Sequence, residues 1–423
     1  MRRYVMQPIH CRFIITPAFV ALLIFAFSGC QEMMKQMPAG TDQYLNTGMS
    51  VGGAIMNRPK FSEADEERMA QDNAKKYDGS HKMWEDPLLD AYLGDIVQRL
   101  VAQAHPRPFV YSLRVVNEGS INAFTFGGGL LYVNAGLIAR MDNEAQLAMV
   151  LAHEIAHVTE SHVTKGIEDS YGIQLLGEIG RVTAASTGAT AQIPPALLNK
   201  TYEYSMKASV SGHGRANESE ADVVGLDYMV KAGYDPREAP GTFEQLMKEY
   251  GDQTSIQNFF YGDHPTNKSR IEKLTWLVQS KYSQDLETRK LITNTAEFKQ
   301  RTRELLVEVG RSDYERKKFK TATAMFEKAL LANDKDHRSH YYIGKIASET
   351  GGPAGLQQAV THLTTATQLD DTFADAYREL GLAYYKQRNK PKAIEAFQRY
   401  LSLNGGAKDA GAIKRYLDEL KRT

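Results

Sequence analysis

The pentad His153-Glu154-Ile155-Ala156-His157 constrains this chain most, because apolar residues at helical spacing surround it. Residues four apart on an α-helix share a face, so His153 and His157 point in one direction. Two imidazoles so placed can bind one zinc ion, and Glu154 can act on a water there as general base. Asn143 and Gln146 resemble a capping box that begins this helix. The alternative is a buried helix whose histidines hold no metal.

A second informative stretch runs from Asn217 to Gly225. Glu218 and Asp222 lie one helical turn apart, and Gly225 falls on the same face. This pattern offers a carboxylate ligand, a carboxylate that can orient a histidine, and a glycine that permits close helix packing. A solvated acidic face is the alternative. The presence of His153 and His157 favours the metal-site interpretation.

Short β-rich segments precede the metal helix. Residues 110–116 alternate in a way that favours a strand, and residues 121–126 and 130–133 flank Gly127-Gly128-Gly129. The latter two segments are expected to form a hairpin beside the metal helix. An edge strand there can bind an extended peptide by backbone pairing.

Length and composition limit the possible classes. A chain of 423 residues predicts two domains with additional segments. Its 51 basic and 51 acidic residues give zero net charge, so nucleic acid is not expected as a partner. The two cysteines, Cys11 and Cys30, both lie near the N-terminus, which argues against a disulfide framework or a cysteine zinc site in the rest of the chain.

The N-terminus is typical of an export signal, with Arg2, Arg3 and Arg12 before the apolar run 13–27. Phe27-Ser28-Gly29-Cys30 resembles a bacterial lipobox, which implies lipidation of Cys30. Gln31 after it favours the outer membrane of a Gram-negative cell. An uncleaved signal anchor is the alternative.

Together these motifs resemble the HtpX and Ste-type zinc metallopeptidases, a gluzincin family, and in particular its periplasmic members with tetratricopeptide repeats. The resemblance covers roughly residues 63–278 and then the repeats. It implies an α+β zincin-like peptidase domain, mostly helical with a small sheet, that binds one Zn²⁺ per chain. By this resemblance the ligands are His153, His157 and Glu218, and Asp222 is the partner of a histidine.

The resemblance also implies further site residues. Asn122-Ala123-Phe124, with Gly128 and Gly129, corresponds to the substrate-binding edge. A histidine and an arginine at the spacing of His264 and Arg270 stabilise the oxyanion in relatives. His264 is alternatively a blocking ligand that keeps the enzyme latent, or a loop histidine that caps a helix. His162 is expected on the opposite helix face, away from the metal.

The C-terminal part repeats itself. Gly310, Gly344 and Gly381 recur, and small and aromatic residues follow each at corresponding positions. About three tetratricopeptide units and a capping helix are therefore expected, as an all-α solenoid. The solenoid is expected to dock a peptide or a partner protein, and a purely structural appendage is the alternative. The expected organisation is signal peptide 1–29, tether 30–60, peptidase 61–280, helical connector 281–302 and repeats 303–421. Residues 171–195 are interpreted as either a lid or ordinary helical packing.

The sequence thus predicts a lipid-anchored zinc endopeptidase of the cell envelope, periplasmic and on the outer membrane. Unfolded or misassembled envelope proteins are the expected substrates, a role implied by the resemblance. The rival hypothesis is a chaperone or assembly factor that acts through its repeats and whose zinc site is latent.

Overall fold

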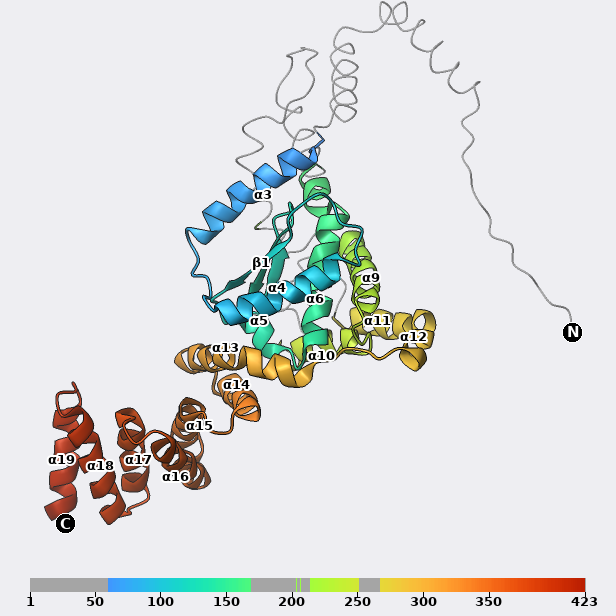
Figure 1. Cartoon of the computed structure of the whole chain (residues 1–423). Coiled ribbons are helices and arrows are strands. Elements are labelled where there is room, and N and C mark those ends of the chain that lie inside the picture. Colours follow the sequence, from blue (N-terminus) through green and yellow to red (C-terminus); the bar gives the residue numbers. More distant parts are fainter. Residues whose placement is uncertain (1–59, 169–202, 204–205, 207–213, 251–266, 423) are drawn as a thin grey trace, which may run out of the picture. The chain divides into compact units, whose positions relative to one another are not determined.

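The computed structural model describes residues 60–168, 203, 206, 214–250 and 267–422 (Figure 1). The expected signal peptide, the lipobox with Cys30, the tether, the possible lid at 171–195 and His264 lie outside these residues. Among the described helices, none is both long enough and apolar enough to cross a membrane.

Two capped helices open the described part. Helix α3 (Glu63–Asp78) begins at Ser62, whose hydroxyl accepts from the Asp65 amide in a complete capping box. Helix α4 (Pro87–Val101) begins at Asp86, whose carboxylate accepts from two amides of the first turn.

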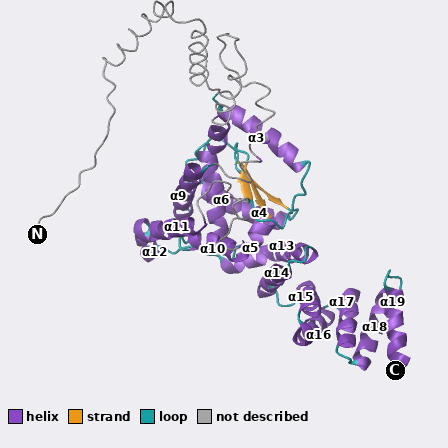
Figure 2. Ribbon diagram, turned by 180° about the vertical axis from the view of Figure 1, so that it is seen from behind, coloured by secondary structure: helices purple, strands orange, loops and turns teal. Residues whose placement is uncertain are grey.

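Three short strands form a mixed sheet, β1 (Ser112–Val116), β2 (Ala123–Thr125) and β3 (Leu130–Asn134), in the order β1-β3-β2 (Figure 2). Strands β2 and β3 pair antiparallel, which confirms the hairpin. Strand β1 pairs parallel with β3, with Val115 opposite Val133. Strand β2 is therefore an edge strand, and it contacts helix α6 (Glu144–Thr159), which carries His153 and His157.

The hairpin turn depends on its glycines. Gly127, Gly128 and Gly129 have φ of 83°, 58° and 82°, which residues with a Cβ rarely adopt. Helix α3 covers this turn so closely that a Cβ on Gly128 would lie 2.8 Å from that of Ala70. The Gly128 amide donates to the buried Glu66 carboxylate at 3.1 Å.

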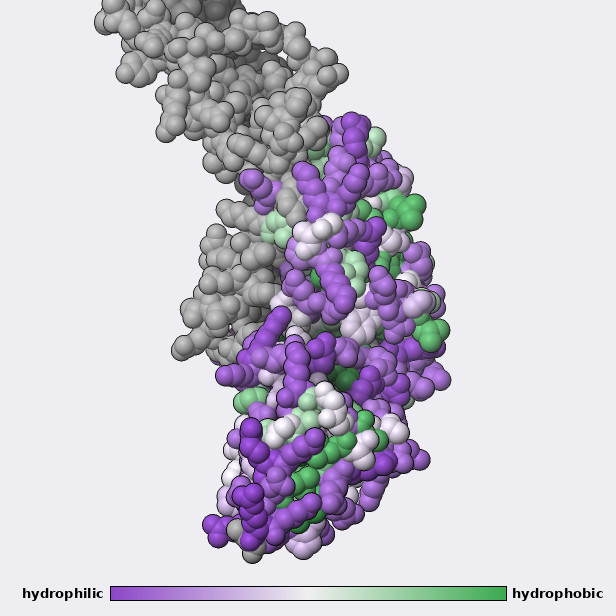
Figure 3. Space-filling model, turned by 90° about the vertical axis from the view of Figure 1, so that its left-hand side faces the viewer, coloured by the Kyte–Doolittle hydropathy of each residue, from purple (hydrophilic) through white to green (hydrophobic). Residues whose placement is uncertain are grey.

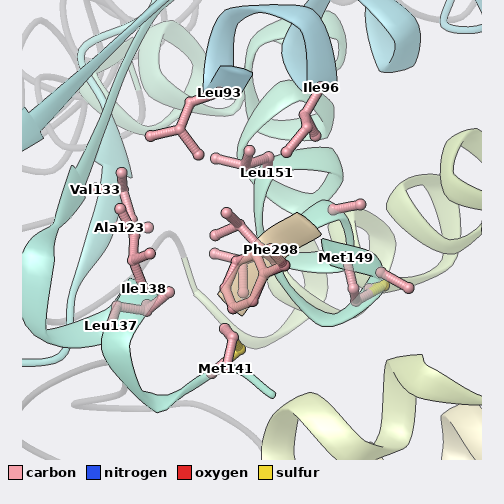
Figure 4. Packing of buried hydrophobic residues seen from close by; sticks show 14 of the residues in the cluster. Leu93, Ile96, Ala123, Val133, Leu137, Ile138, Met141, Met149, Leu151 and Phe298 are labelled. Atoms are coloured by element: carbon pink, nitrogen blue, oxygen red, sulfur yellow. The ribbon is translucent and has the colours of Figure 1, made fainter. Parts of the chain in front are cut away.

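Helix α6 is central to the part of the structure that precedes the C-terminal helices, because every residue from Glu144 to Val158 is buried. Helices α9 (Arg215–Lys231) and α10 (Glu238–Tyr250) pack directly against α6, and α5 (Ala135–Arg140), α11 (Asn267–Lys281) and α12 (Ser283–Thr288) are the further helices of this part of the chain. Figure 4 shows the apolar core beside α6, where Leu93 and Ile96 of α4 meet Leu151. Phe298, from a helix far along the chain, lies in the same core.

The C-terminal helices form antiparallel pairs followed by a last helix: α13 (Thr295–Glu315) with α14 (Phe319–Ala332), α15 (His337–Thr350) with α16 (Gly352–Leu369), α17 (Ala374–Lys386) with α18 (Lys390–Asn404), and then α19 (Ala410–Arg422). The recurring glycines permit the pairing, since a Cβ on Gly310 or Gly381 would lie 2.8 or 2.5 Å from the phenyl ring of the partner helix. Hydrophilic side chains cover most of the described surface in Figure 3, around an apolar strip on the repeats.

Candidate metal centre

Helix α6 presents the two histidines of the pentad. Its N-cap is Asn143, whose side chain accepts from the Gln146 amide at 2.9 Å. The Gln146 side chain accepts from the Asp142 amide instead of returning to Asn143, so only half of the expected capping box forms. The helix then continues without interruption through His153 and His157.

Helix α9 brings a carboxylate to these histidines. The Nε2 atoms of His153 and His157 lie 3.0 Å apart. The Glu218 carboxylate oxygens lie 3.2 Å from Nε2 of His153 and 3.3 Å from Nε2 of His157. Tetrahedral zinc with bonds of about 2.0–2.1 Å holds its ligand atoms roughly 3.3 Å apart. The three donors therefore fit a zinc ion, and they are the one group of this kind within the described residues.

Asp222, one turn after Glu218, accepts from the other nitrogen of His153, with Nδ1 and Oδ1 3.1 Å apart. It also binds the guanidinium of Arg270 from α11, whose Nε lies 2.9 Å from Oδ2. Burial raises the pKa of Asp222, but the charge of Arg270 and the hydrogen bond from His153 outweigh burial and lower it. Asp222 is therefore a charged acceptor in a position from which it could orient His153.

Arg270 is 2% exposed and lies against the Phe243 ring, 4.1 Å from its centroid. The family resemblance implies an oxyanion role for it. The structure places its guanidinium on Asp222 and 3.4 Å from Nδ1 of His153.

Burial shapes the proton affinities at this centre. Burial alone would lower the pKa of His153, but hydrogen bonds to Asp222 and Glu218 outweigh it and raise the pKa to about 9. Burial also raises the pKa of Glu154 to about 7, because desolvation penalises its carboxylate. A carboxyl group with this pKa can accept and release a proton near neutral pH.

The structure places His162 beside His157, and not on the opposite face of the helix as the sequence predicted. Helix α6 ends at Thr159, and Ser161 adopts a left-handed conformation with φ 59°. The chain turns there, and His162 becomes fully buried with its Nδ1 2.9 Å from Nδ1 of His157. Helical periodicity fails here because it assumes an uninterrupted helix, and no sequence signal marked the turn.

The expected substrate-binding residues divide into different environments. Phe124 is buried in an aromatic cluster, stacked on Tyr132 with ring centroids 5.0 Å apart, whereas Ala123 faces the main core. The Asn122 side-chain oxygen is buried and has no hydrogen-bond partner among the described residues. Gly128 and Gly129 are buried in the hairpin turn, under α3 and beside Phe109 and Val110.

Comparison with known proteins gives a consistent result. The model of peptidase family M48 matches residues 87–278, and tetratricopeptide-repeat models match residues 356–387 and 374–407. The beta-barrel assembly-enhancing protease of Escherichia coli K12 is 31% identical over 233 residues, which cover 54% of this chain and 46% of that protein. The mitochondrial metalloendopeptidase OMA1 of Schizosaccharomyces pombe is 29% identical over 241 residues, 55% of this chain and 67% of that protein.

The metalloprotease LoiP of Escherichia coli K12 is 29% identical over 185 residues, 43% of this chain and 68% of that protein. The chain spans about half the length of the curated beta-barrel assembly-enhancing protease, at 46%. The matched region contains the strands, the metal helix and the helix that supplies Glu218. Residues 87–278 therefore belong to peptidase family M48, and tetratricopeptide repeats follow them in the chain.

Proposed function

We propose that this protein is a zinc-dependent endopeptidase. The observation that carries the proposal is the convergence of His153, His157 and Glu218, with Glu154 buried beside them. Three protein ligands from two helices leave a fourth position for water or substrate, as in catalytic zinc sites. One zinc per chain follows from the single donor group in the described part.

Each residue of the centre has a separate task. A zinc ion held by the three ligands would act as Lewis acid, activating water and polarising the scissile carbonyl. Glu154 takes the proton of the attacking water and delivers it to the leaving amine. Asp222, held by Arg270, keeps His153 in the tautomer that offers Nε2 as a ligand.

Strand β2 is the proposed substrate-binding element. It is an edge strand in contact with α6, so an extended peptide can pair with its backbone close to the metal ligands. The Asn122 oxygen supports this role, because a buried acceptor without a partner in the described part is suited to a peptide N–H. Gly128 and Gly129 contribute by shaping the turn between β2 and β3.

Unfolded or misassembled proteins of the bacterial cell envelope are the proposed substrates. A relative is named for enhancing β-barrel assembly, and extended peptides fit an edge strand. The repeats are proposed to dock a partner protein. Lipidation of Cys30 would anchor the chain to the outer membrane. His264 and Arg270 remain proposed oxyanion residues, with His264 alternatively blocking the metal.

The test compares zinc content and casein cleavage in the wild-type protein, Glu154→Gln and the matched surface variant Glu85→Gln. Glu85 is exposed and lies outside the site, so this variant should behave as wild type. We expect one zinc per chain in all three proteins and loss of cleavage in Glu154→Gln alone. Absence of zinc from the wild-type protein would refute the metal site. Zinc without cleavage in every protein would instead favour the chaperone hypothesis.

A further inference from the structure

The two histidine ligands differ in what supports their outer nitrogens. Nδ1 of His153 meets the Asp222 carboxylate directly, at 3.1 Å. Nδ1 of His157 instead meets a second imidazole, with Nδ1 of His162 2.9 Å away. Beyond it, Nε2 of His162 lies 3.2 Å from Oε2 of Glu220 on α9. A histidine is thus interposed between the ligand and a carboxylate.

The distances determine which nitrogen of His157 and of His162 carries a proton. If the proposed function is right, Nε2 of His157 binds the metal and its Nδ1 carries the proton. Two N–H groups cannot face each other at hydrogen-bond distance, so Nδ1 of His162 must be the acceptor. The proton of neutral His162 is then on Nε2, where it is donated to Glu220. Both hydrogen bonds can therefore form only if His157 donates to His162 and His162 donates to Glu220.

We propose that His162 is a positioning residue for the metal centre, which holds His157 in its ligating tautomer, and that Glu220 fixes the tautomer of His162. This proposal rests on the proposed zinc site. Its physical basis is that the outer hydrogen bond of a ligating histidine sets the orientation of the ring and the basicity of its metal-binding nitrogen.

Burial gives the three residues distinct positions. His157 is 2% exposed and His162 is fully buried, so water does not easily replace the His162 imidazole beside His157. The Glu220 side chain is 52% exposed. The chain of hydrogen bonds therefore runs from the metal ligand to the protein surface, and its two ends can be changed separately by mutation.

The test measures zinc affinity of the full chain by competition with a chelator, and thermal melting of the metal-free form. His162→Leu replaces the acceptor with an apolar side chain of similar size, and the zinc affinity of this variant should fall about 10- to 100-fold. His162→Asn places an amide oxygen near the former Nδ1, so most of the affinity should return. His105→Leu, at an exposed histidine far from the motif in sequence, is the control and should match the wild type.

A purely structural role predicts a different result, in which both His162 variants lower the melting temperature of the metal-free form and leave zinc affinity unchanged. That result overturns the proposal. If His162→Leu does not fold, Glu220→Ala decides, because a half-exposed carboxylate can be removed without harm to the core. We expect its zinc affinity to fall several-fold, and an unchanged affinity would overturn the inference.

The two levels of proposal fail in different ways. If the wild-type protein binds zinc and the His162 and Glu220 variants have the same zinc affinity, the metal site stands. Only the positioning role of His162 and Glu220 is then rejected. Absence of zinc binding in the wild type would reject the proposed function itself.

Discussion

Gly225 allows the ligand-bearing helices α6 and α9 to approach each other, and Gly225→Ala should damage the metal centre. A Cβ at this position would lie 2.9 Å from the His153 amide nitrogen and 3.0 Å from the Ala152 carbonyl carbon. These are backbone atoms of α6 at the proposed metal ligand His153, and they cannot rotate away. Ordinary contacts of a Cβ are 3.4–4 Å, so the helices would have to separate by roughly 0.5–1 Å.

The separation has two consequences of different size. Overpacking of this kind costs about 1–3 kcal/mol, and the higher helix propensity of alanine returns up to about 1 kcal/mol. The net loss of folding stability is therefore small, about 0–2 kcal/mol. Metal binding is more sensitive, because ligand distances must hold to about 0.2 Å and Glu218 moves with α9. We expect zinc affinity to fall by at least about ten-fold.

The assay is chelator competition for zinc together with urea unfolding of the metal-free protein. Gly94→Ala is the matched control, because Gly94 is also inside a helix, α4, and a Cβ there would have no neighbour within 4 Å. This control should gain up to about 1 kcal/mol and keep its zinc affinity. If Gly225→Ala behaves like Gly94→Ala in both measurements, the close approach of α9 to α6 does not position the ligands.

Three further predictions concern stability. Asp313→Ala should lower the free energy of unfolding in urea by about 3–5 kcal/mol, because it removes the buried carboxylate that lies 3.1 Å from Arg140. The control Arg311→Ala removes an exposed ion pair and should lower it by less than about 1 kcal/mol. Burial raises the pKa of Asp336, but hydrogen bonds from the Ser339 amide and Arg338 outweigh it and lower the pKa. The stabilising effect of the Asp336 carboxylate is thus complete above about pH 4 and is lost as pH falls through the lowered pKa. Urea unfolding at pH 6 and pH 3 should therefore show that the difference in unfolding free energy between wild type and Asp336→Asn is smaller at pH 3. Zinc at 100 times its Kd should stabilise the chain by about 2.7 kcal/mol, and Glu218→Ala should abolish the effect of a chelator on Tm.

Local patterns predicted the elements that make up the metal centre. The spacing of His153 and His157 and of Glu218, Asp222 and Gly225 depends on one helix each, so periodicity alone places them on the right faces. The hairpin was predictable for a similar reason, because its two strands are joined by three glycines. Each of these predictions concerns residues within about ten positions of one another.

Other features arise from pairings that no local pattern contains. The parallel pairing of β1 with β3 follows from long-range packing, and so does the ion pair that joins Arg270 to Asp222 across 48 residues. His162 was misplaced because a single left-handed residue, Ser161, redirects the chain after α6. A serine has no strong preference for the left-handed conformation, so the sequence around Ser161 does not predict the turn.

The first repeat helices are part of the peptidase core, which determines how the repeats can be removed experimentally. Phe298 of α13 is 2% exposed and packs beside Leu137 and Ile138 of α5 (Figure 4). From α14, the Lys328 ammonium lies 3.0 Å from the Arg140 carbonyl oxygen at the end of α5, just before the metal helix begins. A chain that ends at Asn294 loses these contacts and should fail to fold, as measured by its urea transition.

A chain that ends after Leu369 keeps all the helices of the core cluster that includes α13 and α14, and it should fold and bind zinc. This second chain separates the two functional hypotheses, because it lacks α17, α18 and α19 but keeps the candidate centre. Casein cleavage that survives this truncation, together with loss of partner binding, would assign catalysis to the peptidase domain and docking to the last repeats. Loss of folding in this chain as well would show that α17–α19 belong to the same cooperative unit as α6, although their buried apolar residues lie in a second cluster.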